Sequence, residues 1–489
     1  MVKIMLNDIN KIINRLKVET NNTDDIIYRK KNIQNRLIYI IYLEALTSSD
    51  KISDFIIRSL TNIEKTINHK KDIPTIIENS ISNFKIVKIS SYEKLCSYLH
   101  LGYTIILIDD LSYGYALETK SNISRSIDKT DTEITIRGPK DAFVEDFQKN
   151  IGLIRKRIKS NNLWQETLNI GKYTNTKISL LYINGIIKKE LVEKVLKKLK
   201  SIDIDGIIDS GTIKNFLTED SQTLFPTIYT TERPDIVSHA LLKGKIAILI
   251  DNSPYVLIIP GEFKEYFITS EDVYTKSFNV SIIRILKYLA FTIALLAPAV
   301  YIALVTYNQE MLPPELLISF AIQRDTVPFP AFVEAFIMII AFEIIREADL
   351  RVPGFTGSSL SIVGALILGE AAVNAGIVSP IMIIVVAITA LSSLPFTEPE
   401  IVNALRWWRL IFMASASFLG ITGIIFATIL FLTKLASIDI FDIPYLIPFV
   451  PINITGLKNS IIKLPLRKLN KRENYLSENT IKEVFHEKK

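Results

Sequence analysis

The chain has 489 residues, of which 48% are hydrophobic, and its formal net charge is +6. This length exceeds what one ordinary hydrophobic core organises, so we expect several domains. Much of the positive excess lies after residue 457. That distribution indicates a cytoplasmic flank of a membrane segment, and it argues against a nucleic-acid surface, which needs basic residues interleaved with aromatics.

The residues that usually carry enzyme chemistry form no site pattern. The single cysteine, Cys96, excludes an internal disulfide and lies in a helical pattern, where we expect an inert core residue. The four histidines match no hydrolase motif; they are His69, His100, His239 and His486. We therefore expect no enzyme activity, no metal and no cofactor. The first residues lack the apolar run of a signal peptide, so we expect the front half on the cytoplasmic side.

The front of the chain alternates predicted helices and strands. Its pattern predicts an amphipathic helix over residues 1–19, a strand over 37–43 and a helix over 51–69. Residues 102–113 align without gaps on residues 244–255, and a helical pattern precedes each copy. Residues 41–52 also resemble 181–192 at nearly the same offset. Two copies of one α/β unit are the simplest explanation.

Each copy is expected to end in an antiparallel hairpin, because its turn is too short for a parallel crossover. Asp109 and Asp251 lie in these turns. They are candidates for a metal site or an acid–base pair, but a turn-forming role is favoured because Asp bonds its own backbone there.

A sharp turn separates the two copies. It is built on Arg137, Gly138 and Pro139, and a predicted helix follows over residues 144–159 with Asp141 as its N-cap. Arg137 and Lys140 flank the turn and offer an anion or an acidic partner two cationic groups. A structural turn is favoured, because no glycine-rich phosphate loop surrounds it.

The composition becomes strongly apolar after about residue 280. We expect membrane blocks over residues 282–306, 329–345, 360–378, 380–396 and 410–432. Five full crossings from an inside start would place the basic tail outside, against the positive-inside rule. Either one block is therefore re-entrant, or the proline-rich residues 443–451 dip into the bilayer and return. Both termini are expected in the cytoplasm.

Carboxylates interrupt these blocks. Glu334 and Glu343 are nine residues apart, which places them on opposite faces of one helix. Glu343 shares a face with Arg346 and Glu347, so these three predict an ion-pair cluster at the cytoplasmic edge. Glu334 and Glu370 have no partner within their own helices. A polar ion pathway and a buried structural hydrogen bond are equally open for both.

The third block carries a small-residue face that would let another helix approach closely. Its members recur at intervals of four, three and four: Ala365, Gly369, Ala372 and Gly376. Asn374 lies one turn from Glu370 beside this face and is the third candidate for the ion pathway.

Six motifs together resemble the A subunit of spore germinant receptors, the GerA family. They are residues 136–145 (IRGPKDAFVE), 328–334 (PFPAFVE), 342–348 (FEIIREA), 361–369 (SIVGALILG), 371–373 (AAV) and 384–390 (IVVAITA). The resemblance covers about residues 120–470. It departs at Glu370, where a glutamine is expected, and at Asp349, where glycine is common.

The resemblance implies an α/β soluble head of two repeated subdomains followed by an all-α multispanning membrane domain. It implies a location in the spore inner membrane, with head and tail cytoplasmic. The partners it implies are a transporter-like, germinant-binding B subunit, a lipoprotein C subunit and further copies of the chain. The implied function is a homo-oligomeric, nutrient-gated cation pathway that initiates germination.

Two other functions compete with that one. The alternative is a non-conducting scaffold that couples the head to the transporter-like partner. An autonomous transporter is disfavoured, because there are too few spans for two inverted halves.

The predicted domain boundaries follow from these patterns. We expect a first α/β subdomain with its N-terminal helix over residues 1–135, a linker turn and helix over 136–175, and a second subdomain over 176–275. A transmembrane domain of four to six membrane segments follows over 280–435, and a proline-rich interfacial segment with a basic tail over 436–489.

Overall fold

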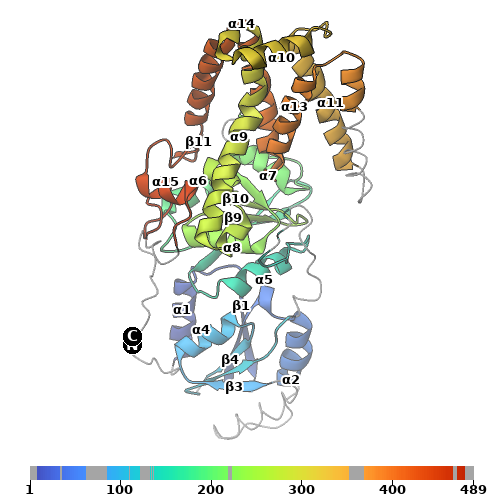
Figure 1. Cartoon of the computed structure of the whole chain (residues 1–489). Coiled ribbons are helices and arrows are strands. Elements are labelled where there is room, and N and C mark those ends of the chain that lie inside the picture. The colour runs from blue at the N-terminus through green and yellow to red at the C-terminus, as the bar shows by residue number, and fades with distance from the viewer. Residues whose placement is uncertain are drawn as a thin grey trace. The chain divides into compact units, whose positions relative to one another are not determined.

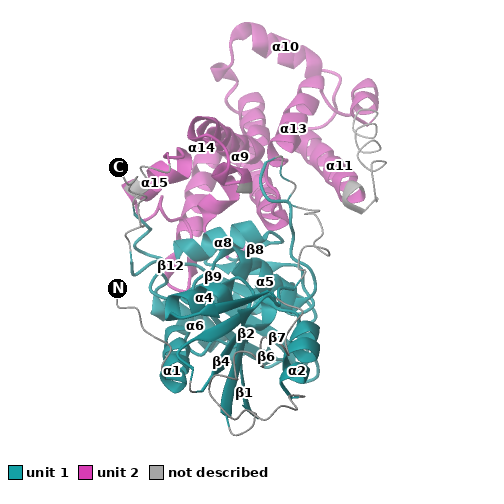
Figure 2. Cartoon of the chain, turned by 90° about the horizontal axis from the view of Figure 1, so that it is seen from below, with its two compact units in different colours: residues 1–221, 228–261, 466–489 teal, residues 222–227, 262–465 magenta. Residues whose placement is uncertain are grey.

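The structure is a computed structural model that describes residues 8–33, 36–61, 85–109, 111–121, 133, 135, 137–218, 223–351, 368–465 and 471–479. The chain forms two compact units, coloured separately in Figure 2. Unit 1 comprises residues 1–221, 228–261 and 466–489, and unit 2 comprises residues 222–227 and 262–465. Unit 1 contains the α/β part of the chain, and unit 2 contains its long apolar helices.

The first subdomain of unit 1 is built on a five-stranded antiparallel sheet of order β1-β2-β4-β5-β3 (Figure 1). Its strands are β1 (Ile26–Ile33), β2 (Arg36–Leu43), β3 (Ile86–Ile89), β4 (Thr104–Ile108) and β5 (Gly114–Leu117). Helices α1 (Ile9–Glu19) and α4 (Tyr92–His100) bury their apolar sides against one face. The π-helical turn η2 (Lys51–Ile57) and α2 (Arg58–Thr61) pack on the other.

The second subdomain repeats this sheet in the order β6-β7-β9-β10-β8. Its strands are β6 (Leu163–Ile170), β7 (Thr176–Ile183), β8 (Tyr229–Thr231), β9 (Ile246–Ile250) and β10 (Val256–Ile259). Its helices are α5 (Phe147–Arg157), α6 (Lys189–Lys200), α7 (Ser210–Leu217) and α8 (Pro234–Lys243).

The two sheets correspond strand for strand, which confirms the predicted repeat. Gly102 and Gly244 end equivalent helices with positive φ of 80° and 92°, a conformation that glycine adopts without strain. Each β4-type strand then forms the predicted antiparallel hairpin with the next strand.

One local prediction in this region is wrong. Asp146, and not Asp141, caps α5, because Asp146 is extended directly before the helix and its carboxylate accepts from the Lys149 amide at 3.1 Å. Instead, both carboxylate oxygens of Asp141 accept a hydrogen bond from the Arg157 guanidinium at 2.7 Å. The predicted helix over 51–69 begins as the π-helical turn η2 and continues as α2; residues 62–69 lie outside the described part of the chain.

The tail packs back onto the second subdomain. Ser477 forms an antiparallel bridge with Ile187, and the Glu478 amide donates to the Ile186 carbonyl at 2.9 Å. Leu476 is fully buried. Residues 471–479 are therefore part of the fold of unit 1.

Unit 2 consists mainly of helices. They are α9 (Ser277–Thr306), α10 (Pro314–Arg324), α11 (Ala331–Arg351), α13 (Pro380–Ser393), α14 (Pro399–Ala436) and α15 (Ile454–Ile461). A short hairpin of β11 (Asp439–Ile440) and β12 (Ile443–Pro444) precedes α15. By length and composition, two of the described helices, α9 and α14, could cross a membrane.

Helix α14 reverses at Gly420 and forms two arms. Gly420 has φ 61° and ψ −139°, and the Asn308 Oδ1 atom accepts from the Ile421 amide at 3.1 Å. Trp408 and Phe412 of the first arm pack on Phe431 of the second, with ring centroids 5.0 and 6.1 Å apart. Trp408 and Phe412 precede Gly420 by about as many positions as Phe431 follows it. Contacts between residues so placed mean that the two arms run antiparallel. The expectation of one continuous block over residues 410–432 is therefore wrong.

Polar and aromatic contacts close one end of unit 2. Arg284 of α9 binds Asp272 at 2.7 Å and donates to the carbonyls of Asn459 and Ser460. Two short helical turns, η4 (Phe263–Phe267) and η5 (Ser270–Val273), lie before α9. Phe263 contacts the rings of Phe225, Phe291 and Tyr445, which brings separate stretches of the chain into one aromatic core.

Candidate functional site

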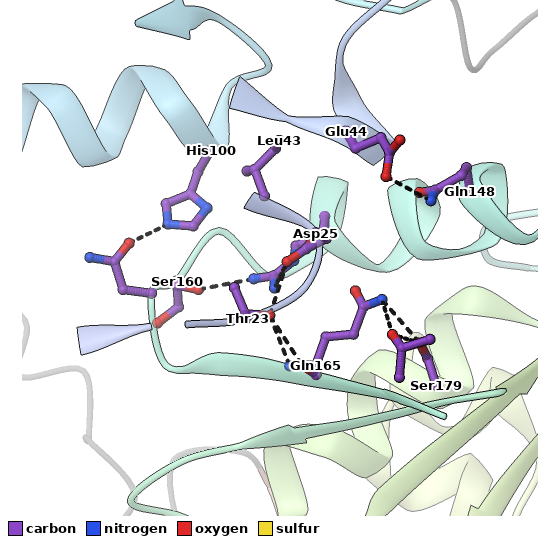
Figure 3. Close-up of polar contacts among 12 residues, drawn as sticks. Thr23, Asp25, Leu43, Glu44, His100, Gln148, Ser160, Gln165 and Ser179 are labelled. Carbon is purple, nitrogen blue, oxygen red and sulfur yellow. Dashed lines mark hydrogen bonds and ion pairs between the residues drawn. The ribbon is translucent and has the colours of Figure 1, made fainter. Parts of the chain in front are cut away.

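A buried ion pair joins the two α/β subdomains inside unit 1 (Figure 3). Arg155 of α5 donates from Nε to Asp25 Oδ2 at 2.7 Å and from a terminal nitrogen to Oδ1 at 3.0 Å. Both side chains are 1% exposed. Asp25 lies in the turn between α1 and β1, so this bidentate contact fixes the first subdomain to a helix of the second.

Further hydrogen bonds surround this pair. The Thr23 hydroxyl accepts from the Gln165 amide at 3.1 Å, and Gln165 donates through its side chain to Ser179 at 3.0 Å. The Trp164 indole donates to the Glu19 carbonyl at 3.1 Å. Strand β6 is thereby attached to the end of α1. We name this set the junction: Glu19, Thr23, Asp25, His100, Arg155, Asn161, Trp164 and Gln165.

Asn161 of the junction contacts two titratable side chains of the first subdomain, His100 and Cys96. His100 Nε2 lies 2.6 Å from Asn161 Oδ1, and burial lowers the pKa of His100. Asn161 also donates to Cys96 Sγ at 3.3 Å, and burial raises the pKa of Cys96. A thiol with a raised pKa is a poor nucleophile, so this environment suits the inert role expected for Cys96.

Arg233 organises the segment that contains the predicted inter-subdomain turn. Its guanidinium is fully buried, pairs with Asp235 at 2.9 Å, and donates to the Thr135 hydroxyl at 2.9 Å and the Pro139 carbonyl at 3.0 Å. Gly138 has a positive φ of 135°, and the Arg137 side chain is exposed. Pro139 of the predicted turn is thus held by a residue that the sequence analysis did not single out.

Glu133 lies beside this arginine in a largely enclosed position. Its carboxylate accepts from the hydroxyls of Thr231 and Tyr229. Burial raises the pKa of Glu133 to about 7, although the hydroxyl of Thr231 and the charge of Arg233 oppose that shift. A carboxyl at this pKa changes its protonation state near neutral pH.

In unit 2, Glu334 is fully buried near the start of α11. Its Oε1 atom accepts from the Ser379 amide at 2.6 Å and from the Ser379 hydroxyl. Ser379 is the N-cap of α13, so the carboxylate lies at the positive end of that helix. The Oε2 atom has no hydrogen-bond partner among the described residues; Arg324 Nε lies 3.9 Å away.

That Glu370 and Asn374 share a pathway with Glu334 remains a prediction. Glu370 and Asn374 are exposed, and among the described residues no hydrogen bond or ion pair joins either to Glu334. The structure describes three of the four residues of the small-residue face, Gly369, Ala372 and Gly376. A Cβ atom on Gly369 would lie 3.6 Å from Ile383 of α13, and Ala372 is buried, whereas Gly376 has φ 64° at the turn before α13. Ala365 lies outside the described residues.

At the other end of α11, Glu343 binds Arg406 of α14 at 2.8 Å. Helical spacing could not predict this partner, because Arg406 belongs to a different helix. Nearby, Arg409 is buried and donates to the Ala294 carbonyl of α9 at 2.8 Å. The predicted cluster of Glu343, Arg346 and Glu347 remains a prediction; Arg346 is half-buried and Glu347 is exposed.

No group of three or more His, Cys, Asp or Glu residues that could hold a metal occurs in the part of the chain that the structure describes. Asp109 and Asp251 follow β4 and β9, and the backbone amide of each donates to the strand alongside, to Leu37 and to Lys177. That position is typical of residues that begin a turn.

Known proteins resemble nearly the whole chain. Residues 14–475 match the family described as "Bacillus/Clostridium GerA spore germination protein". "Spore germination protein KA" of Bacillus subtilis is 40% identical over 93% of this chain and 84% of that protein. "Uncharacterized membrane protein YfkQ" of the same species is 35% identical over 94% of this chain and 90% of that protein.

A solved structure also matches. It is described as "Crystal structure of the N-terminal domain of the A subunit of the Bacillus megaterium spore germinant receptor GerK3" and is 30% identical, covering 54% of this chain and 99% of that one, with a TM-score of 0.43. The extent of the family match and the identity to full-length relatives lead to one conclusion: this membrane protein belongs to the GerA family of spore germination proteins.

Proposed function

We propose that the chain is the A-type membrane subunit of a spore germinant receptor, and that copies of it form a nutrient-gated cation pathway. The proposal includes the spore inner membrane as its location, and a transporter-like B subunit and a lipoprotein C subunit as its partners. Its family membership and the crystal structure title that names an A subunit support the receptor role.

The observation that carries the ion pathway is the Glu334 carboxylate. It is fully buried in unit 2, where one of its oxygens has no hydrogen-bond partner among the described residues. A carboxylate within apolar helices is costly unless it is paired, solvated or able to bind a cation, and the Arg324 guanidinium reaches this oxygen only at 3.9 Å. Glu370 and Asn374 are exposed on a single chain, and in this proposal they face other copies or the pathway.

Two features support cytoplasmic positions for both the head and the tail. Residues 471–479 pack on the second subdomain, so the segments that precede and follow unit 2 in the sequence both belong to unit 1, which we propose lies on one side of the bilayer. The number of complete crossings between residues 262 and 465 is then even. In this proposal the reversal at Gly420 acts as a returning segment, which would bring the basic tail back to the cytoplasmic side.

The Ser379 contacts also favour the alternative, a non-conducting scaffold. Glu334 accepts two hydrogen bonds from Ser379, which is how a purely structural carboxylate would be satisfied. In that role the carboxylate fixes α11 to the start of α13 and the unit transmits movement to a partner.

Reconstitution with both partner subunits separates the two functions. Nutrient addition to liposomes should release K⁺ from the wild-type complex, and Glu334→Gln should change conductance or ion selectivity, because a carboxamide keeps the Ser379 acceptor but removes the charge. Glu370→Gln is measured alongside. If an assembled Glu334→Gln, Glu370→Gln complex conducts as the wild type does, these residues do not line the pathway.

Thiol reagents give an independent test of the scaffold. Single cysteines introduced along residues 328–396, in a chain whose Cys96 is replaced by serine, should react with a membrane-impermeant reagent in a stripe if the unit conducts. A scaffold should give no water-accessible stripe through the bilayer.

A further inference from the structure

A groove opens between α9 and α13 within unit 2. It is open to the surroundings and has a volume of about 410 Å³. Its apolar walls are Ile283 and Leu286 of α9 and Ile388 and Leu391 of α13, all of them 45–63% exposed in the single chain. Such an exposed apolar surface in a membrane protein contacts either acyl chains or another protein.

One cation lines this groove. Lys287 is only 8% exposed, and among the described residues no hydrogen bond or ion pair reaches its ammonium. Arg284, one turn earlier, differs from Lys287: its guanidinium forms an ion pair with Asp272 and donates hydrogen bonds to the carbonyls of Asn459 and Ser460. A largely buried lysine side chain whose ammonium forms no direct ion pair with the described residues, although Asp272 and Glu271 lie near enough to act on it, can accept a further anion, and Ser392 adds a hydroxyl to the same lining.

The position of Lys287 indicates where that anion comes from. Arg284 lies where the polar segments around Asp272 and Asn459 meet α9, which places it at the boundary between polar and apolar parts of the unit. Lys287 follows by one turn and the lining beyond it is apolar. A lysine one turn from this boundary, with apolar residues around its stem, fits a lipid phosphate at headgroup depth.

We propose that this groove binds an anionic phospholipid, with its phosphate on Lys287 and Ser392 and an acyl chain between Ile283, Leu286, Ile388 and Leu391. A zwitterionic lipid carries a compensating cation next to its phosphate, so it offers Lys287 no net charge. The site requires only that the chain lies in a membrane, and it is independent of whether the chain conducts ions.

Native mass spectrometry of the purified full-length chain, equilibrated with equal amounts of phosphatidylglycerol and phosphatidylcholine, tests the proposal. The wild type should retain phosphatidylglycerol preferentially. Lys287→Met should bind it about five-fold more weakly, which corresponds to the loss of one near-surface lysine–lipid attraction. Lys287→Arg should keep the preference.

Two further variants locate the site. Lys434→Met removes an exposed lysine of the same unit away from the groove and should leave binding unchanged. Ala290→Phe fills the groove but keeps Lys287, and it should reduce the retention of both lipids. Each variant is compared at matched helicity and elution volume, so that misfolding is not scored as lost binding.

Several results would overturn the proposal. Equal retention of the two lipids by the wild type, or an unchanged preference in folded Lys287→Met, would remove the role of Lys287. Displacement of the lipid by inorganic phosphate at equal concentration would indicate a free-anion site. Binding to the monomer but not to an oligomer would show that a second copy covers the groove.

Discussion

Asp25 and Arg155 form a bidentate ion pair that is 1% exposed and joins the two repeated subdomains. Loss of one partner leaves the other charge buried and unpaired, which typically costs 3–5 kcal/mol. We therefore expect Asp25→Ala to destabilise the head by about 3–5 kcal/mol, measured as a lower thermal midpoint of the full chain in detergent.

An exposed ion pair in the same unit provides the control. Lys172 and Asp203 lie 3.1 Å apart with side chains 60% and 75% exposed, so Lys172→Ala should cost less than about 1 kcal/mol. The double variant Asp25→Ala, Arg155→Ala should recover part of the loss. Equal effects of Asp25→Ala and Lys172→Ala would contradict the importance of burial.

Glu133 should make the stability of the head depend on pH. Burial raises its pKa from 4.5 to about 7, so the folded state favours the neutral carboxyl. The resulting stabilisation is fully present below pH 4.5 and is lost as pH rises through 7, by about 3 kcal/mol.

Glu133→Gln removes this titration and should flatten the stability profile between pH 5 and 8, as followed by chemical denaturation at several pH values. Glu118→Gln, at a partly exposed carboxylate of the same unit that pairs with Lys120 on the surface, is the control and should leave the slope unchanged. A slope that persists in Glu133→Gln assigns the pH dependence to other groups.

Gly420 should not tolerate a side chain. A Cβ atom there would lie 2.6 Å from Asn308 Oδ1 and 2.8 Å from Tyr307 Cβ, and φ is 61°. We expect Gly420→Ala to cost at least about 1–2 kcal/mol from the backbone conformation alone, and to lower the thermal midpoint of the purified protein. Gly369→Ala, whose new Cβ meets Ile383 at an ordinary 3.6 Å, should be tolerated by the single chain.

The buried leucine of the tail offers a further measurement. Leu476→Asp would place a charge at a fully buried position and should release residues 471–479 from Ile186 and Ile187. Trypsin should then cleave after Arg472 faster than in the wild type. Leu476→Met conserves the volume and should keep the wild-type cleavage rate. An unchanged rate in Leu476→Asp would mean that the tail does not depend on this contact.

The repeat and the fold class were predictable because they are local properties of the chain. Gly102 and Gly244 sit in matching positions of two similar segments, and strand periodicity predicts the hairpins that follow. The reversal at Gly420 was not predicted, because an apolar run around a glycine looks the same whether the helix continues or turns back. Its cause is a contact with Asn308, more than a hundred residues earlier.

Long-range pairing also explains what the sequence missed at the charged residues. Glu343 has Arg346 within its own helix, yet its contact is Arg406 of α14. Asp25 and Arg155 are separated by 130 positions, and Arg233 reaches back to Thr135 across 98. Helical spacing predicts neighbours within three or four residues and carries no information on partners from other elements.

The contact of Ser477 with Ile187 has a consequence for how the chain is made. These residues are close in the folded protein but 290 positions apart, and unit 2 is translated between them. The second subdomain therefore leaves the ribosome well before the segment that completes it, and it must wait while the apolar helices are inserted into the bilayer. Closing so long a loop carries an entropic cost that grows slowly with its length. If the ribosome stalls within unit 2, residues 471–479 are not made and Ile187 has no bridge to Ser477. Unfinished chains therefore expose a backbone edge that finished chains cover, and a protease or chaperone could recognise it.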